Sequence, residues 1–297
     1  MIITSCGNSE YVARGLAKKL KAKYSPLTIA AFPDGDLYLR FNTSLRGKKV
    51  VMVQSFHPHP DMSLFDIIFA AKTARELGAK KIILVAPYLA YMRQDKRFHP
   101  GECVSSKVMA GLLNDDVDKI ITIDPHLHRY KSLKDIFTIS TVCLTANGLL
   151  GEYIKKKYQP LKSNLVIIGP DWESYQWAED IAKIVGVPAT VLEKTRLSSW
   201  EVHSKMVHPI PIKGKDVVIV DDIISTGRTI AEAARQAKSM GAKSIRTVGV
   251  HGIFVEDAIE KMKKAGVVDI VSTNCIDKEN SKIDVTLLLV EELKKER

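Results

Sequence analysis

The sequence predicts an α/β protein of two duplicated domains, each a mostly parallel sheet flanked by helices. Two observations predict this fold. Short runs rich in Val and Ile alternate with segments of helical periodicity, and one strand–helix–turn–strand unit occurs twice. The length agrees, because 297 residues suit two domains of about 150 residues that each bury a core.

Several short apolar runs have the length and composition of buried strands. They lack the polar alternation of a half-exposed strand, so they predict parallel sheets that are covered on both faces. The predicted strands are residues 2–6, 50–54, 82–86, 119–123, 165–168, 217–220 and 244–250.

Helical patterns fill the segments between these strands. Gly78 and Gly241 directly follow two of the patterns, in the position where glycine commonly ends a helix. The predicted helices are residues 10–20, 63–77, 104–113, 172–185 and 230–240.

The duplication is visible in the residues themselves. Residues 47–54 read Gly-Lys-Lys-Val-Val-Met-Val-Gln, and residues 214–221 read Gly-Lys-Asp-Val-Val-Ile-Val-Asp. The turn after the next helix also repeats, as Leu-Gly-Ala-Lys-Lys-Ile at 77–82 and Met-Gly-Ala-Lys-Ser-Ile at 240–245. Each half of the chain therefore carries one copy of the same unit.

We place the domain boundary near residues 142–147. This gives an N-terminal domain of residues 1–143 and a C-terminal domain of residues 144–297. We expect the C-terminal helix, at residues 290–295, to pack back on the N-terminal domain.

Composition excludes several classes of protein. The longest segment without charge or histidine, 136–151, is shorter than the roughly 20 apolar residues of a membrane span, and no signal-peptide pattern is present. We therefore expect a cytoplasmic protein without a membrane partner. The four cysteines lie far apart, which is typical of reduced thiols. The net charge of +10 is compatible with nucleic acid, with an anionic small substrate or with solvated lysines, so charge alone decides nothing. No nucleic-acid-binding module occurs, so we expect no nucleic acid partner.

The strongest local signal lies at residues 217–229, where an apolar strand ends in two carboxylates and a hydroxyl-rich loop opens a helix. Ligands bind at the carboxyl ends of parallel strands, and a helix N-terminus attracts anions. Glycine lets the backbone approach closely, hydroxyls donate to a phosphate, and carboxylates accept from sugar hydroxyls. The plain alternative is an N-capped helix. A phosphorylated sugar fits this loop, with candidates Asp221, Asp222, Ser225, Thr226, Gly227, Arg228 and Thr229.

This string resembles the 5-phosphoribosyl 1-diphosphate (PRPP) binding motif of the phosphoribosyltransferase fold. Residues 87–97, Pro-Tyr-Leu-Ala-Tyr-Met-Arg-Gln-Asp-Lys-Arg, resemble the ATP-contacting segment of ribose-phosphate pyrophosphokinases, and residues 100–107 resemble the next segment of those enzymes. Residues 32–36, Phe-Pro-Asp-Gly-Asp, match the Phe-x-Asp-Gly-Glu loop of the same family.

Three further motifs extend the resemblance over essentially the whole chain. Residues 124–126, Asp-Pro-His, resemble the family's metal-binding histidine segment, and residues 169–171, Gly-Pro-Asp, resemble its second metal site. Residues 194–196, Lys-Thr-Arg, resemble the Lys-x-Arg of its catalytic flexible loop. The resemblance implies two duplicated phosphoribosyltransferase-type domains, of which only the rear one keeps the phosphate loop.

The resemblance implies an enzyme of nucleotide biosynthesis that transfers the diphosphoryl group of Mg-ATP to the C1 hydroxyl of ribose 5-phosphate, giving PRPP and AMP. Charge builds on phosphate oxygens in such a reaction, so cations must neutralise it. Lys194 and Arg196 are the expected catalytic cations. Residues 193–203 around them have neither helical nor strand periodicity, which predicts a loop that orders over bound substrate. A solvated turn is the alternative from that segment alone.

On the ATP side, the phenyl ring of Phe32 is suited to stack on adenine, while Asp34 and Asp36 would accept from its amino group. Arginine suits bidentate contact with phosphate, and glutamine can read an adenine edge. A β-turn and a surface charge cluster are the plain alternatives. The resemblance makes the ATP-binding candidates Phe32, Asp34, Asp36, Arg93, Gln94, Asp95, Arg97 and His99.

The family presents the loop at residues 32–36 to the site of a neighbouring subunit. The resemblance therefore implies a homo-oligomer, at least a dimer, with an ATP site shared between subunits. Hexamer, tetramer and dimer all remain open.

The resemblance makes His126 and Asp171 the metal candidates, with Mg²⁺ as the cofactor. Mg²⁺ prefers oxygen ligands, so a histidine needs a carboxylate or nucleotide phosphates close by. The pair His126 and His128 would suit zinc, but no further ligand lies at a suitable spacing.

The chain departs from the family pattern in one longer segment. Residues 129–137 differ from the Gln-Ile-x-Gly-Phe-Phe that follows the histidine in the allosteric members, and the chain is also shorter than those members. Two smaller departures are conservative: Asp36 stands where the family usually has Glu, and Ser225 stands where many members have Asp. We therefore expect a compact, weakly regulated form.

Two other functions stay open. A phosphoribosyltransferase would consume PRPP with the same loop at 221–229, but it would not need the motifs at 32–36 and 93–95. A non-catalytic regulatory relative would keep the fold, but it would not need Lys194 and Arg196.

Overall fold

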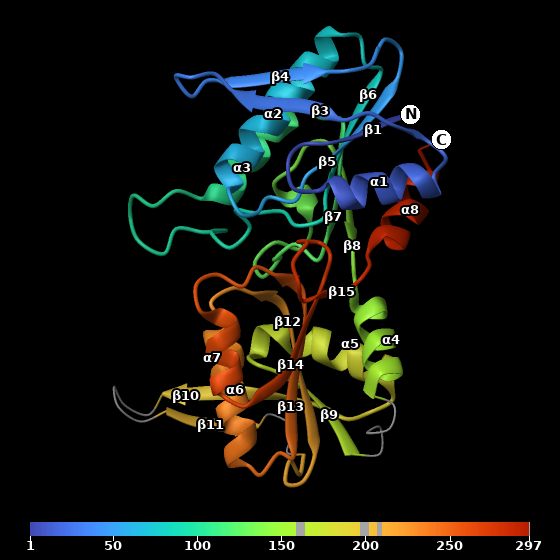
Figure 1. The fold of residues 1–297 in the computed structure, drawn as a ribbon. Helices are drawn as coiled ribbons and strands as arrows, with labels where there is room; N and C mark the ends of the chain where they lie inside the picture. Colours follow the sequence, from blue (N-terminus) through green and yellow to red (C-terminus); the bar gives the residue numbers. More distant parts are fainter. Residues whose placement is uncertain (159–163, 197–201, 207–209, 297) are drawn as a thin grey trace. The chain divides into compact units, whose positions relative to one another are not determined.

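The computed structural model describes residues 1–158, 164–196, 202–206 and 210–296. The chain divides into two units (Figure 1). Unit 1 comprises Met1–Thr145, Cys275–Asp277 and Val285–Arg297, and unit 2 comprises Ala146–Asn274 and Lys278–Asp284. The chain thus returns to unit 1 after passing through unit 2.

Unit 1 contains a six-stranded sheet in the order β2-β1-β5-β6-β7-β8, in which all neighbouring strands are parallel. The strands β5, β6 and β7 are almost wholly buried, as the unbroken apolar runs predict. The strands are β1 (Ile2–Ser5), β2 (Lys23–Tyr24), β5 (Lys49–Val53), β6 (Lys81–Ala86), β7 (Lys119–Ile123) and β8 (Ser140–Leu144).

A separate antiparallel hairpin in unit 1 joins β3 (Leu27–Ala31) to β4 (Leu37–Phe41). This hairpin was not predicted from the sequence, because its strands are only partly buried and have no continuous apolar run. The helices of unit 1 are α1 (Glu10–Lys19), α2 (Pro60–Glu76), α3 (Ser105–Asn114), the short η1 (Leu133–Asp135) and α8 (Thr286–Lys294).

Unit 2 contains a seven-stranded sheet in the order β11-β10-β9-β12-β13-β14-β15. All pairs are parallel except β10 with β11. The strands are β9 (Leu165–Gly169), β10 (Ala189–Arg196), β11 (Val202–Met206), β12 (Asp216–Ile224), β13 (Ser244–Gly252), β14 (Val267–Thr273) and β15 (Ser281–Ile283). The helices are α4 (Asn147–Tyr158), the short η3 (Trp172–Ser174), α5 (Tyr175–Val185), α6 (Arg228–Ser239) and α7 (Ala258–Lys264).

The predicted α/β class with two mostly parallel sheets is confirmed. Gly78 and Gly241 both have positive φ, +83° and +85°, directly after the turns that end α2 and α6. Some boundaries differ from the prediction: β12 runs to Ile224, and α6 already begins at Arg228. The core of unit 2 forms where apolar side chains of β12, such as Val217 and Ile219, pack with those of α6.

The C-terminal helix α8 closes the amino edge of the sheet in unit 1. Lys49, Lys81 and Lys119 are the first residues of β5, β6 and β7. Lys119 donates to Glu292 and Glu296 at 2.9 Å each, and Lys81 donates to the carboxylate of Glu296 at 2.6 Å. Lys49 donates to the backbone carbonyl of Glu296. Three neighbouring strands are therefore tied to one chain end, β6 and β7 through opposite charges and β5 through a hydrogen bond to a backbone carbonyl.

The ion pairs with α8 make the stability of unit 1 depend on pH. The hydrogen bond from Lys81, followed by that from Lys119, lowers the pKa of the Glu296 carboxyl to about 2, against the effect of its partial burial. In an unfolded chain a glutamate titrates near pH 4.3, so the carboxylate stabilises the folded state above about pH 4.3. This contribution is lost as the pH falls towards 2, because the folded state must then also bind the proton.

We expect Glu296→Gln to lower the free energy of unfolding by about 2–3 kcal/mol at pH 7, and the gap to wild type to close as the pH falls from 4.3 to about 2. Urea unfolding of both proteins at several pH values measures this gap. Glu291→Gln is the matched control, since Glu291 lies on the surface of α8, shortly before Glu296, and pairs with exposed Lys294 at 2.7 Å. The control should change stability by less than about 0.5 kcal/mol at any pH. A gap that does not vary with pH would contradict the assignment.

Candidate functional site

Three carboxylates lie close together at the carboxyl edge of the sheet in unit 2. Asp171 follows β9, while Asp221 and Asp222 belong to the last part of the neighbouring strand β12. Burial raises the pKa of Asp221 well above its ordinary value, and the negative charges of Asp222 and Asp171 add to the shift. A cluster of this kind is relieved by binding a proton or a cation.

Backbone amides orient these carboxylates. The Asp222 amide donates to Asp221 Oδ1 at 3.1 Å, and the Ile223 amide donates to Asp222 Oδ1 at 2.8 Å. Asp171 caps the turn η3, because its Oδ1 accepts from the Ser174 amide at 3.0 Å. The same serine donates its hydroxyl to the Asp171 carbonyl at 2.7 Å. Backbone amides thus orient all three carboxylates, two on the strand β12 and one at the turn η3.

The loop at residues 225–227 joins β12 to α6 and presents the N-terminus of that helix. Gly227, at the N-cap, has a φ of +67°, and a Cβ there would lie 2.9 Å from the Ala258 carbonyl oxygen. The Ser225 carbonyl accepts from the Val255 amide at 3.2 Å, and the Thr226 carbonyl accepts from Lys261 Nζ at 3.4 Å.

This loop has the chemistry of an anion site. The first amides of a helix have no acceptor within the helix, and its dipole favours negative charge there. The hydroxyl-bearing residues Ser225, Thr226 and Thr229 are partly buried around this N-terminus, and Arg228 is exposed. The structure thus brings the predicted phosphate-loop residues together, beside the acidic pair at the end of β12.

The backbone of Lys194 and Arg196 lies in β10. These two residues pair with Ser204 and Val202 of β11 in an antiparallel ladder. The prediction of an irregular loop over 193–203 is therefore wrong for the parts that the structure describes, since polar residues form a hairpin there. Residues 197–201 and the side chains of both cations lie outside the described part of the structure.

The predicted adenine loop at residues 32–36 forms the tip of the β3–β4 hairpin. The Phe32 amide donates to the Asp36 carbonyl at 2.8 Å, and the Asp36 amide donates to Asp34 Oδ1 at 3.3 Å. The Phe32 ring is 51% exposed and meets the Tyr38 ring edge-on, with the ring centres 5.6 Å apart. The tip of the hairpin therefore exposes the Phe32 ring and the carboxylates of Asp34 and Asp36 to solvent.

The segment at residues 93–99 follows β6 at the carboxyl edge of the sheet in unit 1. Arg93, Arg97 and His99 are exposed, as a phosphate-binding role requires. The carboxylate of Glu102 closes the segment, since it accepts from the amides of Phe98 at 2.7 Å and His99 at 3.0 Å.

Gln94 and Asp95 differ from their exposed neighbours. The side-chain oxygen of Gln94 accepts from the Ser105 hydroxyl, which leaves its amide NH₂ as the donor for a base edge. Asp95 is buried and bonded to Arg129. Its carboxylate therefore faces the protein rather than an open site.

His126 follows β7, the strand next to β6. Its Nδ1 lies 2.8 Å from Nε2 of His128, with the two ring centres 3.6 Å apart, so a hydrogen bond fixes the orientation of the ring. His126 belongs to unit 1 and Asp171 to unit 2.

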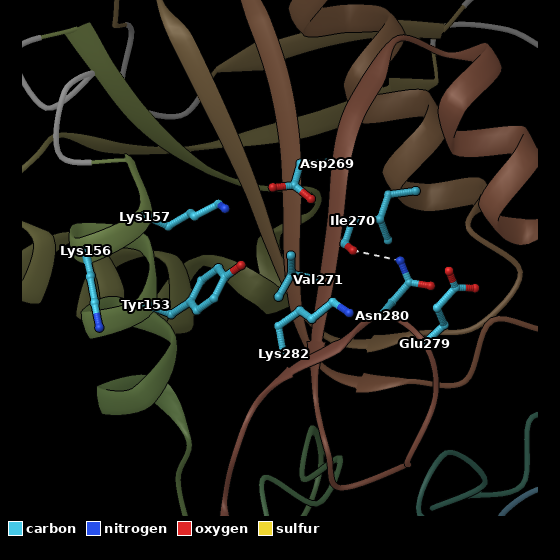
Figure 2. Close-up of a pocket in the computed structure, with 9 residues that line it drawn as sticks. All are labelled: Tyr153, Lys156, Lys157, Asp269, Ile270, Val271, Glu279, Asn280 and Lys282. Carbon is cyan, nitrogen blue, oxygen red and sulfur yellow. Dashed lines mark hydrogen bonds between the residues drawn. The ribbon is translucent and has the colours of Figure 1, made fainter.

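A cavity of about 680 Å³ in unit 2 lies between α4 and the β14–β15 edge and contains none of the predicted site residues (Figure 2). The Tyr158 hydroxyl behind it donates to Asp269 at 2.8 Å, and Asn280 donates to the Ile270 carbonyl at 2.9 Å. The lining mixes three lysines with two carboxylates, so no single ligand charge fits it. Its residues are Tyr153, Lys156, Lys157, Asp269, Ile270, Val271, Glu279, Asn280 and Lys282.

Comparison with known families identifies the family of the chain. A family model described as the N-terminal domain of ribose phosphate pyrophosphokinase matches residues 1–115, and a phosphoribosyl transferase domain matches residues 133–288. A ribose-phosphate pyrophosphokinase of Methanopyrus kandleri is 36% identical over 287 residues, covering 96% of both chains. The chain belongs to the ribose-phosphate pyrophosphokinase family.

Other members of the ribose-phosphate pyrophosphokinase family show the same full-length similarity. The enzyme of that name from Saccharolobus solfataricus is 35% identical, over 96% of this chain and 98% of its own. A crystal structure of phosphoribosylpyrophosphate synthetase from Mycobacterium smegmatis matches with a TM-score of 0.87 and 26% identity, over 99% of this chain and 97% of that chain. Separately, among the helices that the structure describes, none has both the length and the apolar character needed to span a membrane.

The close approach at Gly227 yields a prediction for stability. We expect Gly227→Ala to destabilise unit 2 by about 2 kcal/mol more than Gly214→Ala, because only the first substitution forces a Cβ against a backbone carbonyl. Gly214 has a similar φ of +75° with open space around it, so it isolates the cost of the positive φ alone. Urea unfolding followed by tryptophan fluorescence measures the difference, since Trp172 and Trp177 lie in unit 2. Equal losses in the two variants would contradict the argument.

Proposed function

We propose that the chain transfers the diphosphoryl group of Mg-ATP to the C1 hydroxyl of ribose 5-phosphate, giving PRPP and AMP for nucleotide biosynthesis. The observation that carries the proposal is the acidic pair of β12 directly before a glycine-opened helix N-terminus, in a chain of this family. These features supply acceptors for sugar hydroxyls and donors for a phosphate next to each other.

Ribose 5-phosphate binds at the β12–α6 junction. The helix N-terminus, with the hydroxyls of Ser225, Thr226 and Thr229, holds the 5-phosphate. Asp221 and Asp222 accept hydrogen bonds from the ribose hydroxyls and set the orientation of the sugar. Arg228, at the first turn of the helix, adds a positive charge near the phosphate.

The donor set of this edge fits Mg²⁺. Asp171, Asp221 and Asp222 offer the oxygen ligands that Mg²⁺ prefers, and burial, followed by the charges of Asp222 and Asp171, raises the pKa of Asp221. His126 in unit 1 and Asp171 in unit 2 would each bind metal with the help of nucleotide phosphates. When bound, Mg²⁺ neutralises charge on the ATP phosphate oxygens. Lys194 and Arg196 stabilise the charge that develops during transfer.

ATP binds with its phosphates at the segment 93–99, where Arg93, Arg97 and His99 are exposed cations or donors. Gln94 presents its amide NH₂ to the nucleotide. At the hairpin tip, Phe32 stacks on adenine while Asp34 and Asp36 accept from its amino group.

The ATP site is completed by a second copy of the chain in a homo-oligomer. The apolar surface of α2 and α3 supports this assignment, because a monomer leaves it in water. A cavity of about 260 Å³ with an apolar lining, including Leu64, Phe65 and Met109, lies on the same two helices. The large apolar residues exposed on α2 and α3 are Met62, Phe65, Phe69, Val108 and Leu112.

The direct test is to incubate the purified protein with ATP, Mg²⁺ and ribose 5-phosphate and to separate the products. Diphosphoryl transfer releases one AMP for each PRPP, and only in the presence of the sugar phosphate. ADP would identify an ordinary kinase instead. Consumption of added PRPP with a free base, without AMP release from ATP, would favour a phosphoribosyltransferase.

We expect Lys194→Ala to lower kcat by about 100-fold or more with little change in the affinity for ribose 5-phosphate, because the charge acts mainly in the transition state. Steady-state kinetics with each substrate varied in turn measures this split. Lys263→Ala is the control, as Lys263 is an exposed lysine of α7 in the same unit. An unchanged kcat would remove Lys194 from the catalytic machinery.

A shared ATP site predicts complementation between two defective subunits. We expect the double variant Phe32→Ala/Asp34→Ala and the variant Lys194→Ala to be nearly inactive alone at low ATP. Co-expressed in equal amounts as a dimer, they should recover about a quarter of wild-type activity, since half of random dimers are mixed and each of these has one intact site. No recovery in mixed dimers isolated through two different tags would place each ATP site within one subunit.

A further inference from the structure

We infer that Arg129 and Tyr130 are positioning residues, which fasten the ATP-binding segment at 93–99 to the histidine segment at 124–128. The inference rests on the proposed function, in which the first segment binds ATP. Both segments leave the same edge of the sheet, because β6 and β7 are parallel neighbours that pair Ala86 with Thr122. Nothing in the strands themselves fixes how the two segments lie beyond that edge.

The first link is an ion pair with a buried carboxylate. Nη1 of Arg129 lies 2.9 Å from Oδ1 and 3.1 Å from Oδ2 of Asp95. The Asp95 side chain is 1% exposed, whereas that of Arg129 is 41% exposed. A buried carboxylate is costly without a partner, so the pair holds Asp95 in one place. The guanidinium also lies over the Phe98 ring, 5.3 Å from its centre, and so contacts a second residue of the same segment.

The second link is made by the phenol of Tyr130. Its hydroxyl donates to the Asp95 carbonyl at 3.0 Å and lies 2.9 Å from the hydroxyl of Ser106. Ser106 is fully buried in the first turn of α3, and its hydroxyl lies within 3.2 Å of the Gln94 carbonyl. Tyr130 therefore holds the backbone of the ATP-binding segment against α3.

These links fix the position of the Gln94 side chain, which would contact the nucleotide. The side-chain oxygen of Gln94 accepts from Ser105, which precedes Ser106 on α3. Arg129 and Tyr130 follow His126 closely in the sequence, so a shift of the histidine segment would move Asp95 and Gln94 with it. Both residues open the stretch 129–137, which departs from the Gln-Ile-x-Gly-Phe-Phe pattern. Neither glutamine nor isoleucine carries a positive charge or a phenol.

We expect Arg129→Gln to raise the KM and the Kd for ATP about tenfold, and Tyr130→Phe about threefold, while the KM for ribose 5-phosphate changes by less than about twofold. Steady-state kinetics, together with calorimetric titration of ATP and Mg²⁺, measures these values. Lys131→Gln, at the next and exposed position, is the matched control and should leave all three constants unchanged.

Two additional variants separate positioning from stability. Arg129→Gln/Asp95→Asn removes the unpaired buried charge, so it should restore stability in urea while the Kd for ATP stays raised. Arg129→Lys keeps the charge and should recover part of the ATP affinity. The inference is overturned if Arg129→Gln and Tyr130→Phe bind ATP as tightly as Lys131→Gln, or if the double variant regains affinity along with stability. Failure of the wild type to form AMP and PRPP would overturn the proposed function instead, and the binding measurements would still decide the inference.

Discussion

The direction of the strands is the constraint on which the candidate sites depend. In parallel sheets all carboxyl ends meet at one edge, so polar residues that follow different strands are collected there without any local interaction between them. In unit 2 this brings Asp171 to the neighbourhood of Asp221 and Asp222, and their charges add to the effect of burial, which raises the pKa of Asp221. Unit 1 collects the ATP-binding and histidine segments in the same way, after β6 and β7.

The two copies of the repeat use the same position for different purposes. Where β12 carries Asp221 and Asp222, the corresponding strand β5 is followed by Gln54 and Ser55, both buried. The side-chain amide of Gln54 donates to the Ser63 hydroxyl at 2.8 Å. The Ser55 hydroxyl donates to the carbonyl of Cys275, which lies where the chain has returned to unit 1. The neutral side chains after β5 thus join chain segments, whereas the carboxylates of β12 are suited to binding a ligand.

Features with a local cause were predictable from the sequence. Most of the buried strands are visible in the sequence as apolar runs. The phosphate loop is visible because its turn requires glycine at position 227, where φ is positive. The strands β2, β3, β4, β8, β10, β11, β14 and β15 were not predicted. In β3, β4 and β8 most side chains are only partly buried, and such strands have no continuous apolar run and gain their stability from pairing. The Asp95–Arg129 pair could not be predicted either. It joins residues from segments after two different strands, and each sequence taken alone resembles a solvated charge cluster.

Stability and chemistry are divided between opposite ends of the same strands. At the amino ends of β5, β6 and β7, three lysines bind the chain end at Glu296. At the carboxyl ends of β6 and β7 lie the segments that carry Arg93, Gln94 and His126. Charges at the amino edge can therefore be neutralised within the protein, whereas exposed cations at the carboxyl edge remain for a ligand. Asp95 is a charged residue at the carboxyl edge that is neutralised within the protein. By pairing with Arg129 it joins the ATP-binding segment to the histidine segment.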